Sequence, residues 1–332
     1  MRAVQVSELT GPAALSVVEV DEPAADGQNL LVDVKAAGVS FPELLQTRGQ
    51  YQLKIDPPFI LGAELAGVVR DAPAGSGFAA GDRITALAPL GGAFAEAVLV
   101  PPFTAFKLPD ALDFGQGAGY CMNYHTAHFA LARRAGLSAG ETLLVHGAAG
   151  GTGTAAIQVG KGLGARVVGV VSTEEKAEVA RRAGADDVVL VDAAAAGDPA
   201  GDAGWRAAAG PADVIFDPVG GSRFDESIRA LAPEGRLVVI GFTEGSIPTV
   251  SVNRLLFRNV SIVGAGWGHF AFERPEYLRE VSADLDRMVA AGHVAPIVGR
   301  RYPLEGVRDA LEDLDGRRAV GKLVLDIEEE PA

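Results

Sequence analysis

One segment, Gly140 to Ser172, limits the possible folds of this chain more than any other. It reads GETLLVHGAAGGTGTAAIQVGKGLGARVVGVVS, in which an apolar run leads into clustered glycines, a helical pattern and a second apolar run. A strand, a tight glycine turn, a helix and a second strand, in this order, form the βαβ unit that binds dinucleotides. We therefore predict strands at Thr142–His146 and Arg166–Val171, with a helix at Thr154–Gly162 between them.

The turn matches the dinucleotide fingerprint at three positions: Ala148, which replaces the first glycine, then Gly150 and Gly153. Gly150 would let the backbone approach a pyrophosphate, and Gly153 would let the helix pack close to the strand. The amide N–H groups at the start of the helix would then face the phosphates. We expect the cofactor to contact Ala149, Gly150, Gly151, Thr152 and Gly153.

The residues after the second strand indicate which dinucleotide is bound. An NAD enzyme usually has an Asp or Glu there to hold the ribose 2′-hydroxyl. This chain has Ser172 and Thr173, followed by Lys176. Hydroxyls and an ammonium can bind a 2′-phosphate that a carboxylate would repel, so we expect NADPH. Glu174 and Glu175 lie close by in the sequence and count against this choice.

The pattern of the chain changes at about residue 119. Residues 1–118 hold short β-type runs separated by Gly, Pro and Asp, which is typical of a mostly β domain. In residues 119–269 strands alternate with helix-length segments, as in a doubly wound parallel sheet, and Val260–Val263 is a candidate edge strand. We expect the terminal run Lys322–Ile327 to pair back into the first domain. A length of 332 residues also favours two domains.

Composition excludes several classes of partner. The 29 Lys and Arg residues against 43 Asp and Glu residues give a net charge of −14, which disfavours nucleic acid and anionic membrane surfaces. No run approaches the ~20 apolar residues that span a bilayer, and the N-terminus lacks the apolar core of a secretory signal. The single cysteine, Cys121, excludes an internal disulfide and reads as a small buried residue. We expect a cytoplasmic protein that binds neither nucleic acid nor membranes.

Two segments have a biased composition. The Ala/Gly/Asp-rich run Ala193–Gly210 predicts a weak surface helix, and Glu328–Glu330 predicts a solvated acidic tail.

Blocks along nearly the whole chain resemble the quinone oxidoreductases and ζ-crystallins of the medium-chain dehydrogenase/reductase superfamily. The resemblance implies a GroES-like β-rich catalytic domain (1–118 and 270–332) and a Rossmann NADP-binding domain (119–269), with the active site between them. It also implies a homodimer. The blocks are Gly140–Lys161, AAGVSFPELLQTRGQY at Ala36–Tyr51, PPFILGAELAGVV at Pro57–Val69, GGAFAEAV at Gly91–Val98, NYHTAHFAL at Asn123–Leu131, FDPVGG at Phe216–Gly221 and GKLVL at Gly321–Leu325.

The residues at the zinc-ligand positions of the superfamily do not suit a metal. Zinc-dependent alcohol dehydrogenases carry a Cys where this chain has Ser40 and a His where it has Ala63, and Glu64 alone does not make a site. His125 and His128 form an HxxH pair without further ligands nearby in sequence, so we interpret them as packing or polar residues. We expect no catalytic zinc.

Without a Lewis acid to acidify an alcohol, hydride transfer suits a substrate that is already electrophilic. A quinone, or a C=C bond conjugated to a carbonyl, needs only orientation, exclusion of water and hydrogen bonds to the developing oxyanion. We therefore expect an NADPH-dependent quinone or enone reductase. Two alternatives stay open: an enoyl-thioester reductase, and a non-catalytic dinucleotide-binding or structural protein.

Resemblance to the family also assigns roles to single residues. Tyr51 matches a tyrosine at the substrate cleft and is the expected hydrogen-bond donor to the substrate oxygen. Ser40, often Asn in the family, is the second candidate catalytic residue, and Phe41 and Phe59 are candidate apolar walls of the substrate site. Packing is the alternative for Tyr51, Phe41 and Phe59, and for Trp267 among the cofactor residues. The further candidate cofactor contacts are Tyr124, Thr126, Gly241, Phe242, Gly266, Trp267, His269 and Arg317.

Overall fold

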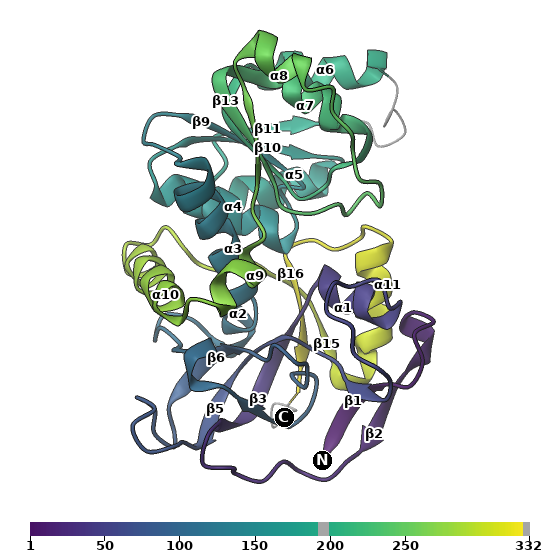
Figure 1. Ribbon diagram of the computed structural model, residues 1–332, viewed down its shortest axis with the longest axis vertical. Coiled ribbons are helices and arrows are strands. Elements are labelled where there is room, and N and C mark those ends of the chain that lie inside the picture. Colours follow the sequence, from purple (N-terminus) through teal and green to yellow (C-terminus); the bar gives the residue numbers. More distant parts are fainter. Residues whose placement is uncertain (192–198, 328–332) are drawn as a thin grey trace. The chain divides into compact units, whose positions relative to one another are not determined.

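The computed structural model describes residues 1–191 and 199–327, which form two compact units (Figure 1). Unit 1 comprises Met1–Met122, Pro275–Ser282 and Pro296–Ala332, and unit 2 comprises Asn123–Arg274 and Ala283–Ala295. Residues 283–295 group with unit 2, whereas the boundaries expected from sequence place them with the first domain. The predicted tail Glu328–Glu330 and residues 193–198 of the alanine-rich run lie outside the described residues.

Unit 2 contains a six-stranded sheet with the order β11-β10-β9-β12-β13-β14, in which every pairing is parallel. The chain reverses direction across the sheet between β9 and β12, which makes this the topological switch point. The doubly wound sheet, its βαβ unit and the edge position of the last strand are as predicted. The strands are β9 (Thr142–His146), β10 (Arg166–Val171), β11 (Asp187–Leu190), β12 (Ala212–Asp217), β13 (Leu231–Val239) and β14 (Ser261–Gly264).

Helices cover both faces of this sheet (Figure 1). On β9, Leu144 belongs to the apolar cluster that includes residues of α6 and α7, whereas Leu143 faces α4, where a Cβ on Gly160 would lie 2.5 Å from its Cδ2. Adjacent strand residues point to opposite faces, so α4 and the α6–α7 pair lie on opposite sides. The helical elements from residue 121 to residue 290 are η3 (Cys121–His125), α3 (Thr126–His128), η4 (Phe129–Ala135), α4 (Gly151–Gly162), α5 (Glu174–Arg182), α6 (Pro199–Ala209), η5 (Gly221–Arg223), α7 (Phe224–Ala230), α8 (Asn253–Arg258), α9 (Trp267–Phe272) and α10 (Pro275–Ala290).

Unit 1 contains two antiparallel-rich sheets, and the larger one combines strands from both ends of the chain. The larger has the order β15-β16-β3-β5-β6-β8, with β7 also paired to β3, and the smaller has the order β2-β1-β4. Strand β16 pairs antiparallel with β3, with Leu323 opposite Val39, as predicted for the terminal run. The strands are β1 (Arg2–Val6), β2 (Leu15–Glu19), β3 (Leu30–Val39), β4 (Phe59–Ile60), β5 (Glu64–Asp71), β6 (Arg83–Leu87), β7 (Ala97–Val100), β8 (Ala105–Lys107), β15 (Val298–Pro303) and β16 (Lys322–Asp326).

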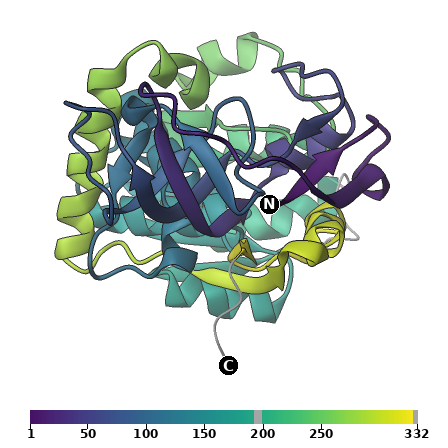
Figure 2. The ribbon, with the colours of Figure 1, turned by 90° about the horizontal axis from the view of Figure 1, so that it is seen from below.

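The short helices of unit 1 include one whose start positions a candidate catalytic residue. Ser40 is the N-cap of α1 and forms a capping box with Glu43, and Pro42 occupies the first turn, where a missing N–H does no harm. In Figure 2 the purple N-terminal strands and the yellow C-terminal elements of this unit both come into view. Its helical elements are η1 (Pro12–Ala14), α1 (Phe41–Thr47), η2 (Pro102–Thr104), α2 (Phe114–Gly117), η6 (Leu304–Gly306) and α11 (Val307–Asp315).

No helix in the described part of the chain is both long and apolar enough to cross a membrane.

Candidate functional site

The glycine turn of unit 2 lies at the carboxyl edge of the parallel sheet. His146, the last residue of β9, pairs with Val170 of β10, and the Ala148 N–H donates to the Val170 carbonyl at 3.3 Å. Ser172, directly after β10, therefore follows its strand at the same edge as the turn. This edge, next to the topological switch point, is where doubly wound sheets bind their ligands.

Gly153 and Gly150 have different surroundings, so glycine serves a different purpose at each position. A Cβ on Gly153 would lie 2.1 Å from the carbonyl oxygen of Gly147, so only glycine lets α4 start so close to the turn. The close packing predicted for Gly153 is thus confirmed. A Cβ on Gly150 would meet its nearest atom at 3.6 Å, which is an ordinary contact. The space beside Gly150 is open to a ligand, as a pyrophosphate approaching the backbone requires.

The start of α4 has the features of an anion site. Gly150 is the N-cap, and within the described residues no side chain hydrogen-bonds to cap this end of the 12-residue helix. The N–H groups of the first turn, at Gly151, Thr152 and Gly153, have no acceptor within the helix and point toward its positive end. The turn and helix therefore fit the pyrophosphate of a dinucleotide.

Ser172, Thr173 and Lys176 come together after β10. Thr173 caps α5 by accepting from the Lys176 N–H, and the Lys176 Nζ lies 3.4 Å from the Ser172 Oγ. The carboxylate of Glu174, which counted against NADPH, accepts a hydrogen bond from Arg181 at 2.7 Å. Two hydroxyls and an ammonium at this edge suit a phosphate on the 2′-position.

Three more candidate cofactor residues follow strands at the same edge. Val239 at the end of β13 pairs with Asp217 of β12 and with Gly264 of β14, and it accepts from the Ala265 N–H at 3.0 Å. Gly241, Phe242 and Gly266 therefore follow neighbouring strand ends, as expected for residues around a nicotinamide.

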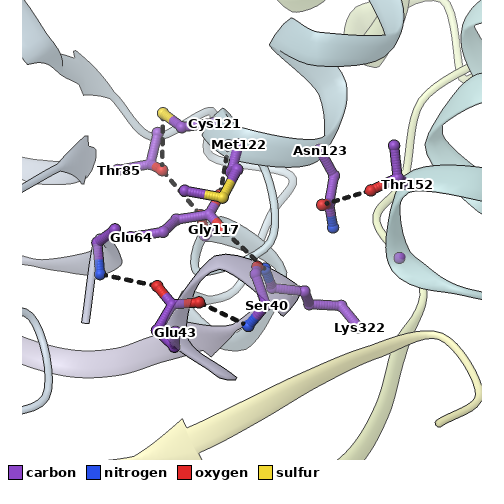
Figure 3. Close-up of polar contacts among 12 residues, drawn as sticks. Ser40, Glu43, Glu64, Thr85, Gly117, Cys121, Met122, Asn123, Thr152 and Lys322 are labelled. Atoms are coloured by element: carbon purple, nitrogen blue, oxygen red, sulfur yellow. Dashed lines mark hydrogen bonds and ion pairs between the residues drawn. The ribbon is translucent and has the colours of Figure 1, made fainter. Parts of the chain in front are cut away.

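The segment before α4 holds two more of the candidate cofactor residues. Tyr124 is 1% exposed and its hydroxyl donates to Gln158 of α4 at 2.7 Å, so this side chain contributes to helix packing. Beside it, Asn123 accepts a hydrogen bond from the Thr152 hydroxyl at 3.2 Å, which links this segment to the phosphate turn (Figure 3). Thr126, the first residue of α3, is half-buried.

The remaining cofactor candidates differ in their surroundings. Trp267 is buried, with its ring edge-to-face against His125 at 5.7 Å, which favours the packing interpretation. Burial lowers the pKa of His125 to about 3, in agreement with a neutral packing residue. His269 is exposed on α9. Arg317 belongs to unit 1 and follows α11, whereas the other cofactor candidates lie in unit 2.

In unit 1 a buried polar cluster surrounds Ser40 (Figure 3). The Lys322 ammonium donates to the Ser40 hydroxyl oxygen at 2.6 Å and to Glu64 Oε2 at 2.8 Å. Glu64 Oε1 accepts from the Met122 N–H at 2.7 Å. The side chains of Lys322 and Glu64 are only 4% and 0% exposed, so the ammonium and carboxylate form a buried ion pair.

Glu43 extends this cluster toward Tyr51. Its carboxylate accepts from the Ser40 N–H at 3.0 Å and from the Ala63 N–H at 3.1 Å. Burial raises the pKa of Glu43 to about 7, partly offset by the Lys322 charge. Burial, followed by the charge of Glu43, also raises the pKa of Tyr51, which keeps this phenol protonated and able to donate. Of the two catalytic candidates of the sequence, Ser40 is hydrogen-bonded to Glu43, whereas Tyr51 is affected by the Glu43 charge.

The two candidate substrate walls are partly buried: Phe41 and Phe59 pack against the main apolar core of unit 1. Packing, the alternative for both rings, is therefore at least part of their role. Cys121 is buried and forms no disulfide, and its sulfur lies 3.3 Å from the Thr85 hydroxyl, so it acts as a small core residue as predicted.

Known proteins resemble the chain over almost its full length. The family description "Alcohol dehydrogenase GroES-like domain" matches residues 26–110, and "Zinc-binding dehydrogenase" matches residues 151–285. Quinone oxidoreductase-like protein 2 of Bos taurus is 33% identical over 98% of this chain and 92% of its own length. This chain belongs to the quinone oxidoreductase family of medium-chain dehydrogenases/reductases.

Solved structures of similar proteins agree with this family. A probable oxidoreductase from Mycobacterium abscessus is 44% identical with a TM-score of 0.87, covering 98% of this chain and 99% of that one. The quinone oxidoreductase from Thermus thermophilus, also solved in complex with NADPH, is 32% identical with a TM-score of 0.81 and covers 98% and 100%. The expected GroES-like and Rossmann combination is confirmed.

A family that includes zinc-binding members raises the question of whether this chain's donors fit a metal. Ser40 and Ala63 supply neither thiolate nor imidazole, and the Glu64 oxygens are bound to Lys322 and to the Met122 N–H. Among residues 1–191 and 199–327, no three His, Cys, Asp or Glu side chains gather in a metal-binding group. These donors do not fit a catalytic zinc.

Sequence reasoning missed Glu43, Lys322 and Asn123 as members of these polar sites. Lys322 and Glu64 are adjacent in space but 258 positions apart in sequence. The available signal was a charged residue inside an apolar run, in GKLVL and in GAELAGVV. Such a residue is expensive to bury unless it has a partner, so each of these runs predicts a partner without identifying it.

Proposed function

We propose that this chain is an NADPH-dependent reductase that transfers hydride to a quinone or an α,β-unsaturated carbonyl compound without zinc. The observation that carries the proposal is the Lys322–Glu64 ion pair beside Ser40, in the position where zinc-dependent relatives have metal ligands. Since the side chains of this cluster form hydrogen bonds but do not suit zinc as ligands, they suit an acceptor that needs no activation by metal.

The cofactor assignment rests on unit 2. The open space beside Gly150 and the first turn of α4 would hold the pyrophosphate, and Ser172, Thr173 and Lys176 would hold the 2′-phosphate. NADPH supplies a hydride from C4 of its nicotinamide when bound. The NADPH complex of the Thermus thermophilus relative supports the same cofactor.

The acceptor side rests on unit 1. As hydride adds to a carbon of the acceptor, the electron pair of its conjugated system moves to the oxygen, which later takes a proton from solvent. Tyr51 and Ser40 are the proposed donors to that oxygen, and a protonated phenol and a hydroxyl both suit this role. Phe41 and Phe59 would form apolar walls against a flat ring.

A panel of acceptors tests the proposal. NADPH oxidation is measured with 1,4-benzoquinone, with an α,β-unsaturated ketone and with an enoyl thioester, and the products are identified. Turnover with the quinone or the ketone supports the proposal. Preference for the thioester by kcat/KM favours the enoyl-thioester alternative, and NADPH binding without turnover favours a non-catalytic protein.

We also propose that two copies pair through the edge strand β14. The segment that precedes it in the chain exposes large apolar side chains: Ile247 is 73% exposed, Leu256 71% and Phe257 78%. Pairing would bury these side chains and the open strand edge, which is otherwise prone to aggregation.

The single, reduced and buried Cys121 suits the cytoplasm, which we propose as the location.

A further inference from the structure

Lys322 carries a buried positive charge that contacts Ser40 as well as its ion-pair partner Glu64. Its side chain is 4% exposed, and its ammonium makes its shorter hydrogen bond to Ser40, at 2.6 Å, against 2.8 Å to Glu64. Taking an ammonium out of water is costly, and replacing a buried ion pair by apolar residues is often neutral for stability. Stability alone therefore does not explain why this ammonium is buried. Its hydrogen bond to Ser40 points to a role in function.

The surroundings hold the Lys322 side chain in one place. A Cβ on Gly119 would lie 2.8 Å from its Cγ, and a Cβ on Gly38 would lie 2.6 Å from its Cε. The carboxylate that anchors the ammonium is itself fixed, because Glu64 accepts from the Met122 N–H. Two glycines and a fixed carboxylate thus direct the ammonium at the Ser40 oxygen.

The direction of the Lys322–Ser40 hydrogen bond follows from chemistry. An ammonium has three donors and no acceptor, so the Ser40 oxygen must accept. The capping box of α1 turns the Glu43 N–H toward the same oxygen. With one lone pair of its oxygen bound by the ammonium, the Ser40 hydroxyl can donate its proton to a ligand. A charge-assisted bond to its oxygen makes it a stronger donor.

Accessibility singles out Ser40 as the member of this group that can meet a ligand. Lys322, Glu64 and Glu43 are buried, whereas Ser40 is half-buried. The positive charge can therefore act on a bound molecule through the Ser40 hydroxyl rather than by direct contact.

We propose that Lys322 is a positioning residue that orients and polarises the Ser40 hydroxyl as a hydrogen-bond donor to an oxyanion of the enolate or phenolate class. This proposal rests on the proposed function, because hydride addition to an enone or a quinone creates such an oxygen. Lys322 gains and loses no proton in the step. It remains an ammonium bound to Glu64, and the oxyanion takes its proton from water.

The test uses 4-nitrophenol as a probe, because its phenolate form absorbs at longer wavelength than its phenol form. The full-length protein is titrated with it, and the apparent pKa of the bound probe is measured by absorbance. The variants are Ser40→Ala, the pair change Lys322→Met with Glu64→Gln, and all three changes together. Removing both charges avoids leaving one buried charge without its partner.

We expect the wild-type protein to bind the phenolate in preference to the phenol. Ser40→Ala and the pair change should each weaken phenolate binding about 10- to 100-fold, as expected for one hydrogen bond to a charged group. If Lys322 acts through Ser40, the triple variant should bind the phenolate as tightly as Ser40→Ala does. Once the Ser40 hydroxyl is absent, Lys322 has no means of acting on the probe.

Gly119→Ala gives a second variant should the pair change prevent folding. It keeps both charges but moves the Lys322 stem, and it should weaken phenolate binding in the wild-type background and not in Ser40→Ala. Matched controls are Ser16→Ala, at an exposed position of β2, and Lys107→Met with Asp82→Asn, which removes an exposed ion pair. Both controls should bind the probe as wild type does.

Three results would overturn the proposal. The first is no phenolate preference in the wild type, and the second is unchanged binding in the pair variant. The third is a loss of affinity in the triple variant equal to the product of the losses in Ser40→Ala and in the pair variant. The same variants measured for kcat/KM with an active acceptor should show the same lack of additivity. Phenolate preference without turnover of any acceptor would reject the proposed function and leave the role of Lys322 standing. Turnover in which the kcat/KM losses of Ser40→Ala and the pair change multiply in the triple variant would reject only the role of Lys322.

Discussion

Replacing each of two turn glycines by alanine should separate folding from cofactor binding. In Gly153→Ala the new Cβ would lie 2.1 Å from the Gly147 carbonyl oxygen, so α4 or the turn must move by about 1 Å to reach an ordinary contact. Forcing one methyl group into packed backbone costs about 1–3 kcal/mol. In Gly150→Ala the nearest atom is 3.6 Å away and φ is −80°, so the cost is mainly the poorer N-cap, about 1 kcal/mol or less.

NADPH binding should respond differently from stability. The Gly150→Ala methyl group would occupy the space through which the pyrophosphate approaches, so we expect at least ~10-fold weaker NADPH binding from a protein that folds normally. Gly153→Ala should lose both stability and affinity. Urea unfolding followed by circular dichroism measures the first, and NADPH fluorescence titration measures the second.

Gly204→Ala is the matched control for both glycine variants. Gly204 lies in α6, and a Cβ there would meet nothing within 4 Å. Because alanine is the better helix former, this variant should be up to about 1 kcal/mol more stable and bind NADPH as the wild type does. Wild-type NADPH affinity in Gly150→Ala, or equal stability of Gly153→Ala and Gly204→Ala, would refute the reasoning about this turn.

Three further predictions concern other parts of the chain. Lys176→Ala should weaken NADPH binding about 10- to 100-fold and leave NADH binding nearly unchanged in fluorescence titrations, whereas equal losses would exclude a 2′-phosphate contact. Because burial raises the pKa of Glu43 from 4.5 to about 7, the stabilising effect of its proton is complete below pH 4.5 and is lost as the pH rises through 7. The unfolding free energy of wild type relative to Glu43→Gln should fall by about 3 kcal/mol over this window in urea titrations, and a constant difference would contradict the shift. Phe257→Glu should halve the molar mass seen by light scattering, while Leu90→Glu, equally exposed at 78% but in unit 1, should leave it unchanged; a wild-type monomer would reject the dimer.

The parallel sheet was predictable because its signals are local. Each strand buried on both faces reads as a continuous apolar run, and the predicted Thr142–His146 and Arg166–Val171 agree with β9 and β10 at both ends. Since strand ends also fix which loops meet at the carboxyl edge, Gly150, Ser172 and Gly241 could be grouped from sequence. Lys176 could also be placed near Ser172, because residues four positions apart lie about one helical turn from each other.

The polar cluster of unit 1 was not predictable in the same way. Lys322 meets Ser40 and Glu64 only because β16, at the other end of the sequence, pairs with β3. No local pattern specifies that register. The bond from the Tyr124 hydroxyl to Gln158 was not predictable either, because it depends on how the segment before α4 packs against that helix.

We propose hydride transfer from NADPH to an electrophilic acceptor without a metal. The most direct test is the kcat/KM for 1,4-benzoquinone, or for the best acceptor of the panel, in full-length protein before and after treatment with a zinc chelator, alongside metal analysis. We predict substoichiometric zinc and the same kcat/KM in both samples. Stoichiometric zinc whose removal abolishes turnover would exclude a metal-free reaction.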